Sequence, residues 1–473
     1  MRKTLFLNPP SYSGFDGGAG SRYQARREIR SFWYPTWLAQ PAAMVAGSRL
    51  IDAPPDGLTV EDVVHRINDY DLIVIHTSTP SLRNDVKVAE RLKQERPGAL
   101  IGFVGAHTSV LPDETLKAST AIDFVTRDEF DYTIRDVASR DRWKDVSGIS
   151  YRRNGSIAHT PDRPLIQNMD ELAFVTDVYK RDLTIENYSI GYLLHPYVSL
   201  YTGRGCRSRC TFCLWPQTLG GHVYRVRSPE NVYEEMKLAK QYFPQVREFF
   251  FDDDTFTDHI PRAIEIARRL KTLGLTWSCN AKANVPYEAL KALKDGGLRL
   301  LLVGYESGNQ QILNNIKKGI RIEQARKFTQ DCKSLGILIH GTFIVGLPGE
   351  TPETIEQTIR FACDLDVYSI QVSLSAPYPG TALYEQAVQN GWLAKGSLVN
   401  DSGVQEATLE YPGLSRAAIF EAMERFYRRF YFRPKPILRI VKDMLKDREV
   451  MVRRLREGRE FLSFMMKHKS SPA

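Results

Sequence analysis

The 473-residue sequence predicts an α/β fold in which a Rossmann-like domain precedes a partial (β/α)6 barrel and a basic helical C-terminal tail. Two series of β-rich segments alternating with helix-like segments predict the sheets, because parallel strands need long crossover connections. A stretch rich in arginine and lysine predicts the tail. We place the first domain at 1–145, a hairpin and linker at 146–196, the barrel at 197–400 and the tail at 401–473.

Four apolar β-rich runs predict the open parallel sheet of the first domain, with helix-like segments such as 83–95 between them. The runs are 3–8, 71–76, 99–104 and 121–126. Residues 148–158 predict a hairpin that turns at Asn154-Gly155, and 161–196 predict a linker to the next domain.

Small polar loops follow two strands of this sheet, at 76–80 and 105–112. Open α/β sheets bind ligands beyond the carboxyl ends of their strands, so these loops are candidates to cradle a phosphate-bearing cofactor. The candidate residues are Thr77, His107 and Ser109. His107 taken alone is more typical of a hydrogen-bonded loop histidine than of a metal ligand.

Six further β-rich runs predict the barrel, near 198–202, 247–252, 275–280, 299–304, 338–346 and 368–375. The chemistry of such barrels lies at the carboxyl ends of the strands. Polar or small residues occur at these ends: Asp253, Asp254, Asn280, Lys282, Glu306, Ser307 and Gly346. Taken singly, a strand-end carboxylate is more often solvated than functional.

Cys206, Cys210 and Cys213 follow the first barrel strand in the run C-R-S-R-C-T-F-C. Three thiolates on one loop can hold three irons of a [4Fe–4S] cluster and leave the fourth iron open. The alternative is a zinc knuckle with His222 as fourth ligand, but this spacing follows no common zinc pattern. The remaining cysteines, Cys279, Cys332 and Cys363, lie in apolar contexts typical of core thiols.

The cysteine loop and the strand-end residues together resemble the radical SAM enzymes. The resemblance implies that S-adenosylmethionine chelates the open iron and is cleaved by one electron to a 5′-deoxyadenosyl radical. Phe212 would then lie against the adenine, Asp253 and Asp254 would accept from the ammonium, and Lys282 would meet the carboxylate. Glu306 would bind ribose hydroxyls or the ammonium, and Gly346 would let the adenine approach the main chain. Asn280 and Ser307 are further candidates for binding the cofactor.

The first domain resembles the cobalamin-binding domain that precedes the barrel in one large class of these enzymes. It lacks the Asp-x-His-x-x-Gly motif, so no histidine is assigned to cobalt. Arg127-Asp128-Glu129 also stands where relatives tend to carry a glycine between two polar residues. Both cobalamin binding and a vestigial domain used for docking therefore remain open at this point.

Along nearly its whole length the chain is similar to the hopanoid-biosynthesis radical SAM proteins, in N-P-P-S-Y, P-T-W-L-A-Q-P-A-A-M-V, G-R-G-C-R-S-R-C-T-F-C-L-W-P-Q and F-Y-R-R-F-Y-F-R-P-K-P-I-L-R. This resemblance implies radical ring contraction of a glucosaminyl bacteriohopanetetrol to the cyclitol ether, with a reductant such as flavodoxin or ferredoxin. An electron and a proton must then quench the product radical, and Tyr201, Tyr305 and Tyr378 are candidates, by residue type and place, to give the proton. The alternatives are a cobalamin-dependent radical SAM methyltransferase acting on a lipid or other small molecule, and a non-enzymatic redox or cobalamin sensor.

The net charge of +8 is concentrated in the tail, where residues 425–469 carry 15 Lys/Arg against 5 Asp/Glu, a local +10 that leaves about −2 for residues 1–424. This pattern predicts either an amphipathic helix at a membrane surface or a charged cap on the barrel. Nucleic-acid binding is disfavoured because no nucleic-acid-binding motif occurs. A thiolate-held cluster and the absence of a disulfide framework predict a cytoplasmic protein, at the inner face of the membrane if the tail binds lipid. We expect no signal peptide and no membrane-spanning helix.

Overall fold

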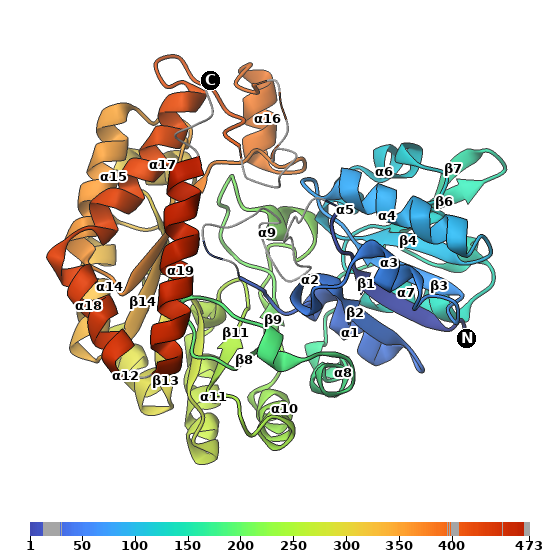
Figure 1. The fold of residues 1–473 in the computed structure, drawn as a ribbon, viewed down its shortest axis with the longest axis horizontal. Helices are drawn as coiled ribbons and strands as arrows, with labels where there is room; N and C mark the ends of the chain where they lie inside the picture. Colours follow the sequence, from blue (N-terminus) through green and yellow to red (C-terminus); the bar gives the residue numbers. More distant parts are fainter. Residues whose placement is uncertain are drawn as a thin grey trace.

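The computed structural model of the chain describes residues 1–12, 29, 31–394, 396, 398, 406–446 and 448–467. It confirms the predicted fold class: a Rossmann-like domain, a curled parallel half-barrel and a C-terminal group of helices follow one another along the chain. Figure 1 shows the first domain on the right, and the half-barrel together with the C-terminal helices on the left. The predicted boundary at residues 400 and 401 lies outside the described residues.

The first domain is built on one sheet, which in the described part of the chain has seven strands in the order β2-β1-β3-β4-β5-β6-β7. Strands β1 to β5 run parallel, and β6 and β7 form the predicted hairpin. Because β6 pairs antiparallel with β5, the sheet continues past residue 145 into the segment predicted as hairpin and linker. The strands are β1 (Thr4–Asn8), β2 (Arg49–Asp52), β3 (Leu72–His76), β4 (Leu100–Val104), β5 (Phe124–Thr126), β6 (Ile149–Arg153) and β7 (Ser156–His159).

Helices cover both faces of this sheet, as alternation of side chains along a strand requires. In β1, Leu5 and Leu7 pack towards α3 and α4, whereas Phe6 packs towards α1 and α7. The core on the α1 side is continuous with the core of the half-barrel, so the two domains share one apolar interior. The helices are α1 (Thr36–Met44), α2 (Ala53–Asp56), α3 (Val60–Val64), α4 (Leu82–Glu95), α5 (Ala106–Val110), α6 (Pro112–Ala118), α7 (Asp131–Ser139) and α8 (Thr176–Asp182).

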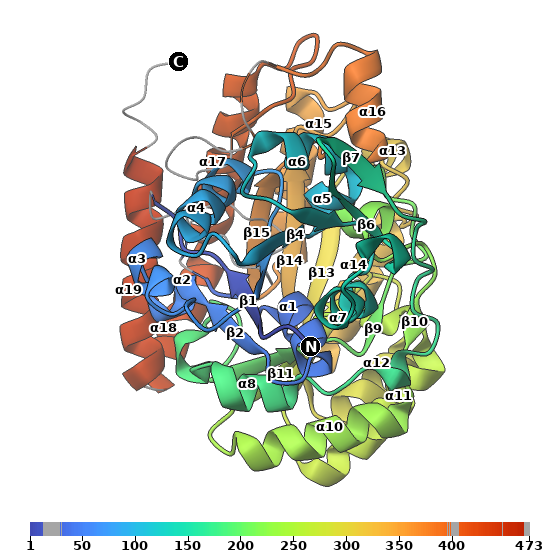
Figure 2. The same ribbon diagram turned by 90° about the vertical axis from the view of Figure 1, so that its right-hand side faces the viewer.

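The second sheet is the predicted partial barrel. Among the described residues it has six parallel strands in the order β15-β14-β13-β12-β11-β8, so β8 and β15 are its two edges. Figure 2 shows the strands of the first sheet in front of β13, β14 and β15. The strands are β8 (Tyr197–Leu200), β11 (Glu248–Phe251), β12 (Trp277–Ala281), β13 (Leu298–Glu306), β14 (Leu338–Val345) and β15 (Ser369–Leu374).

The helices of the half-barrel follow from apolar spacing and from defined ends. In α11, Ala263, Ile266, Ala267 and Leu270 form one buried stripe, and the helix ends at Gly274, whose φ of 63° is left-handed. The helices are α9 (Leu214–Thr218), α10 (Pro229–Tyr242), α11 (Ile260–Leu273), α12 (Tyr287–Asp295), α13 (Gln310–Asn315), α14 (Ile322–Ser334), α15 (Pro352–Leu365) and α16 (Ala382–Gln389).

The C-terminal tail forms three helices, α17 (Arg416–Tyr431), α18 (Pro434–Lys446) and α19 (Arg448–Lys467). Helix α17 packs against β15 and buries Ile419, Ala422, Met423, Phe426 and Phe430. It therefore has the predicted role of a cap, whereas α18 leaves large apolar side chains exposed. Within the described ranges, no helix combines the length and the apolar character that crossing a membrane requires.

Candidate functional site

The cysteine loop leaves the carboxyl end of β8 and is held at its base by a two-stranded ribbon, β9 (Gly203–Arg204) with β10 (Arg225–Val226). Cys206 and Cys210 are buried, and Cys213 is half-buried. The amide of Gln217 donates to the Cys213 carbonyl at 2.6 Å, and the Cys213 N–H donates to the Cys210 carbonyl at 3.2 Å. The loop backbone is thus fixed by its own hydrogen bonds with the three thiols on one short segment.

Two neighbouring strands also hold the loop. The Gly205 N–H donates to Asp254 Oδ2 at 3.0 Å, and the Lys282 ammonium donates to Ser208 Oγ at 2.7 Å. Gly205 has φ of 89°, and a Cβ there would lie 2.3 Å from the Val223 carbonyl oxygen, so glycine is required. Two predicted ligands of S-adenosylmethionine, Asp254 and Lys282, therefore contact the cysteine loop itself.

The alternative predicted for this loop is a zinc knuckle that includes His222. Within the described residues, no three His, Cys, Asp or Glu side chains converge as ligands of one metal ion. The ring nitrogen Nδ1 of His222 lies 3.0 Å from the Ser208 carbonyl oxygen, so this nitrogen donates to the loop backbone. The arrangement disfavours the zinc knuckle, whereas a four-iron cluster needs its three thiolates spread over separate irons.

A buried ion pair that the sequence did not predict lies beside the thiols. Lys318 Nζ is 2.6 Å from Glu306 Oε1, and both side chains are at most 10% exposed. Burial raises the pKa of the Cys210 thiol, and the nearby Lys318 ammonium opposes that rise. Glu306 has a left-handed φ of 62° at a bulge between β13 and β14, a strained conformation of the kind found at functional sites.

Asp253 and Asn280 have different surroundings at the strand ends. Asp253 is fully buried and accepts from the Thr202 N–H and hydroxyl and from the Tyr224 hydroxyl, at 2.5 to 2.6 Å. This burial argues against the predicted contact of Asp253 with the ammonium, because both of its oxygens already hold the end of β8. The Asn280 amide donates to Asp252 Oδ1 at 3.0 Å, and its buried Oδ1 has no hydrogen-bond partner among the described residues.

Three other predicted site residues contact the protein interior. Ser307 is buried, with its hydroxyl 3.1 Å from that of Thr358 in α15. The Gly346 N–H donates to Glu350 Oε2 at 2.7 Å, and the Gly346 carbonyl accepts from the Tyr411 hydroxyl at 2.9 Å, so both backbone groups are bonded within the chain. Phe212 packs on the apolar cluster of α13 and β14.

The tyrosines predicted to quench a radical divide between the two sides of the barrel wall. Tyr305 is buried with its hydroxyl 2.5 Å from Thr329 Oγ1, and so faces α14 outside the half-barrel. This placement argues against Tyr305 as a donor. Tyr201 donates to Asp252 at 3.4 Å at the carboxyl end of β8, and Tyr378 is buried in the loop between β15 and α16.

The predicted loops of the first domain face the cysteine loop, because α5 packs against α9. His107 is buried in α5, and burial lowers its pKa to about 4, which keeps the imidazole neutral. Its Nδ1 lies 3.0 Å from Thr79 Oγ1, whereas Nε2 has no partner among the described residues. Buried polar atoms are normally paired, so this unpaired nitrogen fits a polar cofactor at the sheet edge.

The neighbouring predicted residues bond to their own domain. Ser109 Oγ accepts from the Asp128 N–H at 3.0 Å, and the fully buried Thr77 hydroxyl donates to Asp85 at 2.7 Å. A Cβ on Gly105 would lie 2.3 Å from the Thr77 carbonyl oxygen, so the loops after β3 and β4 are in close contact. Thr77 is therefore part of the carboxyl edge of the sheet, but its hydroxyl is bonded to Asp85 and does not face a cofactor.

A buried salt-bridge network joins the two domains, and the sequence did not indicate it. Arg204, two residues before Cys206, forms a bidentate pair with Asp131 at 2.6 and 3.0 Å. Arg225 forms a bidentate pair with Glu129 at 2.7 and 2.9 Å. All four side chains are at most 4% exposed, so the ribbon below the cysteine loop is fixed to the first domain.

We expect Glu306→Ala to weaken binding of S-adenosylmethionine by roughly 10- to 100-fold, because a hydrogen bond to a charged group contributes about 1.5–3 kcal/mol. Iron content should stay unchanged, and isothermal titration under anaerobic conditions measures the affinity. Because the single variant leaves Lys318 buried without its anion, the double variant Glu306→Ala, Lys318→Met is the matched control. Unchanged affinity in both variants would remove Glu306 from the site.

Two protein-family models match the chain. The Radical SAM superfamily model matches residues 200–362, and the B12 binding domain model matches residues 25–138. The first match contains the cysteine loop and most of the half-barrel, and the second covers most of the Rossmann-like domain.

Relatives cover nearly the whole chain. A protein of Pyrococcus horikoshii named as an uncharacterized methyltransferase is 31% identical over 97% of this chain and 98% of its own length. The solved structure of the radical S-adenosylmethionine methyltransferase TsrM from Kitasatospora setae, with cobalamin and a [4Fe–4S] cluster bound, matches 92% of this chain and 90% of its own, with a TM-score of 0.67 and 15% identity. OxsB, a cobalamin-dependent S-adenosylmethionine radical enzyme, matches 99% of this chain and 71% of its own, with a TM-score of 0.70 and 15% identity.

The two solved structures establish the shared fold, and the Pyrococcus horikoshii relative, together with the two family models, establishes the family. The prediction of an enzyme is thereby confirmed. The chain belongs to the radical SAM superfamily, in the group that carries a B12-binding domain and whose cofactors are the predicted [4Fe–4S] cluster and S-adenosylmethionine, together with cobalamin, which the sequence had left open.

Proposed function

We propose that this protein is a cobalamin-dependent radical SAM methyltransferase that acts on a lipid or another small molecule with an apolar body. The observation that carries the proposal is the packing of α5, at the carboxyl edge of the first sheet, on α9, which begins directly after Cys213. A cofactor at that edge and a cluster on the cysteine loop would share one space. A relative that matches 97% of the chain is named as a methyltransferase, which supports the same activity.

The bound cofactors would supply one-electron cleavage of S-adenosylmethionine and a transferable methyl group. The chain's own residues hold that chemistry in place. Cys206, Cys210 and Cys213 would ligate the cluster, and the network of Arg204 with Asp131 keeps their loop against the first domain. The neutral His107 imidazole would hydrogen-bond to the group at the sheet edge through Nε2.

The second candidate is radical ring contraction of a glucosaminyl bacteriohopanetetrol to the cyclitol ether. Sequence similarity to the hopanoid-biosynthesis branch supports it, and so do the exposed apolar and basic side chains of α18 and α19, which suit a lipid substrate. Either reaction needs an electron donor, for which flavodoxin or ferredoxin is the proposed partner.

The mass of the product separates the two functions. The reconstituted protein is incubated anaerobically with reductant, cobalamin, S-adenosylmethionine carrying a CD3 group and hopanoid extract. Methyl transfer predicts a product that gains the CD3 group, and ring contraction predicts a cyclitol ether without label. An unlabelled product together with full activity in cobalamin-free enzyme would contradict methyl transfer.

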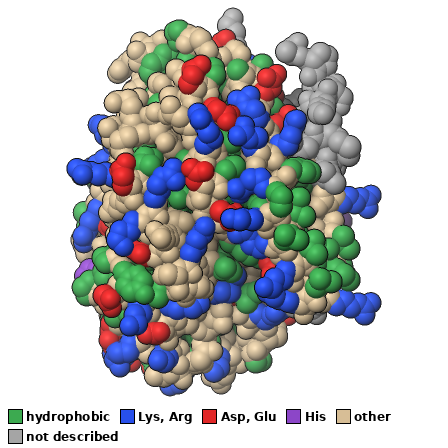
Figure 3. All heavy atoms as spheres, turned by 90° about the vertical axis from the view of Figure 1, so that its left-hand side faces the viewer, with side chains coloured by type: hydrophobic (Ala, Val, Ile, Leu, Met, Phe, Trp, Pro, Cys, Tyr) green, Lys and Arg blue, Asp and Glu red, His purple; other side chains and the backbone are tan. Residues whose placement is uncertain are grey.

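We further propose that the tail brings the protein to the inner face of the membrane. Figure 3 shows apolar and basic side chains side by side on the face that carries the C-terminal helices. Leu438 and Leu445 in α18 are 67% and 81% exposed, and Lys435, Lys442 and Lys446 lie on the same helix. Each basic residue near an anionic leaflet contributes about 1 kcal/mol, an attraction that salt screens.

We expect the protein to float with anionic liposomes at low salt and to be released at high salt. The double variant Leu438→Glu, Leu445→Glu should abolish flotation, because it places two anions on the apolar face. Point variants are preferable to truncation after Leu414, since α17 is part of the core. Val388→Glu, at a 50% exposed position in α16, is the control, and equal flotation of all forms would contradict a role of α18.

A further inference from the structure

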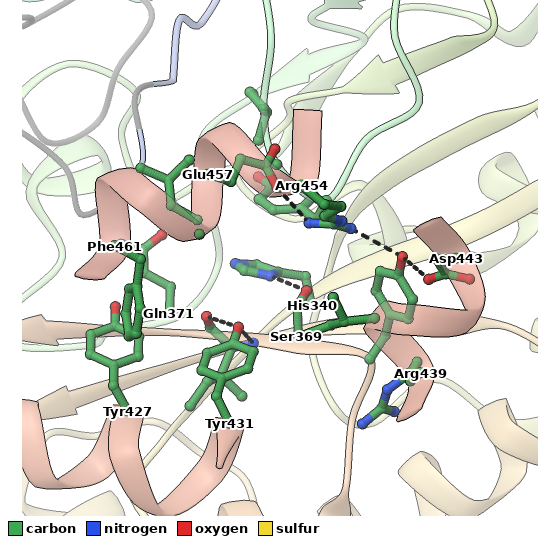
Figure 4. A pocket seen from close by; sticks show the side chains of 18 of the residues that line it. His340, Ser369, Gln371, Tyr427, Tyr431, Arg439, Asp443, Arg454, Glu457 and Phe461 are labelled. Carbon is green, nitrogen blue, oxygen red and sulfur yellow. Dashed lines mark hydrogen bonds and ion pairs between the residues drawn. The ribbon is translucent and has the colours of Figure 1, made fainter. Parts of the chain in front are cut away.

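A cavity of about 440 Å³ lies beside the half-barrel, between β15, the segment before β8 and the three C-terminal helices. Figure 4 shows Tyr427, Tyr431, Phe461 and Gln371 towards one side of the cavity and His340 with Ser369 further along it. The volume falls within the roughly 300–1,000 Å³ of pockets that enclose drug-sized ligands. Apolar and aromatic side chains provide most of its lining.

The cavity occupies the lateral opening of the half-barrel. Strands β8 and β15 are the two sheet edges and do not pair with each other. Helix α19 crosses from one edge to the other: Arg453 donates to the Leu193 carbonyl at 3.1 Å, and Arg454 donates to the Tyr368 hydroxyl at 3.2 Å. Helix α19 therefore covers the gap that a closed barrel would fill with strands.

At two residues of the edge strand β15, tyrosine hydroxyls bond to the backbone groups that face this cavity. The Tyr427 hydroxyl bonds to both backbone groups of Val372, at 2.9 and 3.2 Å, and the Tyr431 hydroxyl bonds to both groups of Ile370, at 2.9 and 3.0 Å. The two phenol rings thus cover the edge and present apolar faces to the cavity, which suits a hydrocarbon ligand.

One wall of the cavity is polar and leads into the half-barrel. His340 stacks on Tyr192, with ring centroids 4.0 Å apart, and its Nδ1 lies 2.8 Å from Ser369 Oγ. On the same face of β15, the Gln371 amide donates to Ser373 Oγ at 3.1 Å, one step nearer the carboxyl end of the strand. A ligand that fills the cavity would have its polar end on this row of side chains, on the way to the edge that carries the cysteine loop.

The mouth of the cavity opens on the apolar and basic surface of α18. Ile437 and Val441 line the cavity and are 45% and 44% exposed. Leu438 and Leu445 continue the apolar surface outside it. The surface proposed to meet an anionic membrane and the entrance of the cavity are thus formed by one helix.

We propose that this cavity binds the hydrocarbon body of a lipid substrate, which enters from the membrane beside α18 and extends its polar end through the half-barrel to the cysteine loop. The inference rests on the proposed function, since it names the substrate class and the place where that substrate is held. The occupant is a membrane lipid with a polar head, because the entrance lies on apolar and basic side chains and the inner wall is polar.

To test this, a larger side chain is introduced into the cavity from α19. Gly458 lines it, and a Cβ at this position would have no heavy atom within 4 Å, so Gly458→Phe places a ring in open space. Gly458→Ala is the matched control, because it adds one methyl group and leaves most of the volume. Val441→Trp, at the exposed mouth, is a second filling variant that does not depend on α19.

Binding is measured with two fluorescent lipids, dehydroergosterol for a polycyclic body and cis-parinaric acid for an acyl chain, by energy transfer from tryptophan; Trp33 lines the cavity. We expect at least one probe to bind the wild type, and both filling variants to weaken it by about tenfold or more, which corresponds to ~1.4 kcal/mol. Gly458→Ala should bind as the wild type does. Equal binding by the wild type and both filling variants would overturn the proposal. A wild-type dimer that dissociates in Val441→Trp would also overturn it, because a second copy of the chain would then be what covers the mouth of the cavity.

A second readout separates this inference from the proposed function. Iron content and cleavage of S-adenosylmethionine are measured in each variant without lipid, and all should match the wild type. Loss of probe binding in both filling variants, with no S-adenosylmethionine cleavage in any form, would support the cavity and contradict the function. Normal cleavage with unchanged probe binding in both filling variants would overturn the cavity alone.

Discussion

Alanine at Cys206, Cys210 or Cys213 is expected to remove the iron–sulfur cluster and to abolish cleavage of S-adenosylmethionine. Each thiolate would hold one iron, and the loop offers no substitute, because the His222 ring is directed at its own backbone. Burial raises the pKa of the Cys210 thiol, so the bound iron must be what keeps this thiol ionised. Alanine at this position removes the iron–thiolate bond. Iron and sulfide analysis and visible absorption measure the loss of the cluster, and 5′-deoxyadenosine formation measures the loss of cleavage.

Cys363→Ala is the control for this series. Cys363 is half-buried in α15, and its thiol lies 3.6 Å from the Arg429 carbonyl oxygen, away from the cysteine loop. The variant should retain the iron content and the activity of the wild type. Full iron content in any one of the three loop variants would remove that cysteine from the cluster.

Glu129→Ala is expected to lower the free energy of unfolding by roughly 3–5 kcal/mol, because it leaves Arg225 buried without its anion. Arg225 is 4% exposed at the side chain, and both of its terminal nitrogens bond to Glu129. Since the pair joins the first domain to the ribbon below the cysteine loop, cluster content should fall as well. Denaturant unfolding followed by circular dichroism, with iron analysis of the folded fraction, measures both effects.

An exposed ion pair serves as the comparison that tests whether burial causes the loss of unfolding free energy. Asp162 pairs with Arg127 at 2.9 Å but is 75% exposed, so Asp162→Ala should change the unfolding free energy by less than about 1 kcal/mol. Glu129→Gln, which keeps an acceptor for Arg225, should fall between the two. If Glu129→Ala unfolds at the same denaturant concentration as Asp162→Ala, the network does not hold the domains together.

The fold was predictable where apolar periodicity is local. All six barrel strands and four strands of the first sheet lie where the sequence placed them, since each is a short apolar run followed by a polar loop. Strand β2 was missed because R-L-I-D is only four residues long with two charges. The hairpin was predicted, but its antiparallel pairing with β5 depends on a tertiary contact that the local sequence does not encode.

The site was predictable where the spacing of residues is itself the signal, as in the cysteine triplet. The side chains around it were harder to predict, because their partners lie far along the chain. The sequence showed Glu129 only as part of the segment where relatives tend to carry a glycine. Its partners Arg204 and Arg225 lie 75 and 96 residues further along the chain, so no local pattern indicated the pairs. The pair of Lys318 with Glu306 depends on a bulge and on the left-handed φ of Glu306, and no sequence pattern indicated either feature.

Formation of 5′-deoxyadenosine shows directly whether the protein is a radical SAM enzyme. The reconstituted protein is mixed anaerobically with S-adenosylmethionine and dithionite, and the nucleoside is quantified by liquid chromatography with mass spectrometry. We expect reductant-dependent 5′-deoxyadenosine from the wild type and from Cys363→Ala, and none from the three loop-cysteine variants. No 5′-deoxyadenosine from wild-type protein with a full complement of iron would contradict a radical enzyme and would favour a sensor.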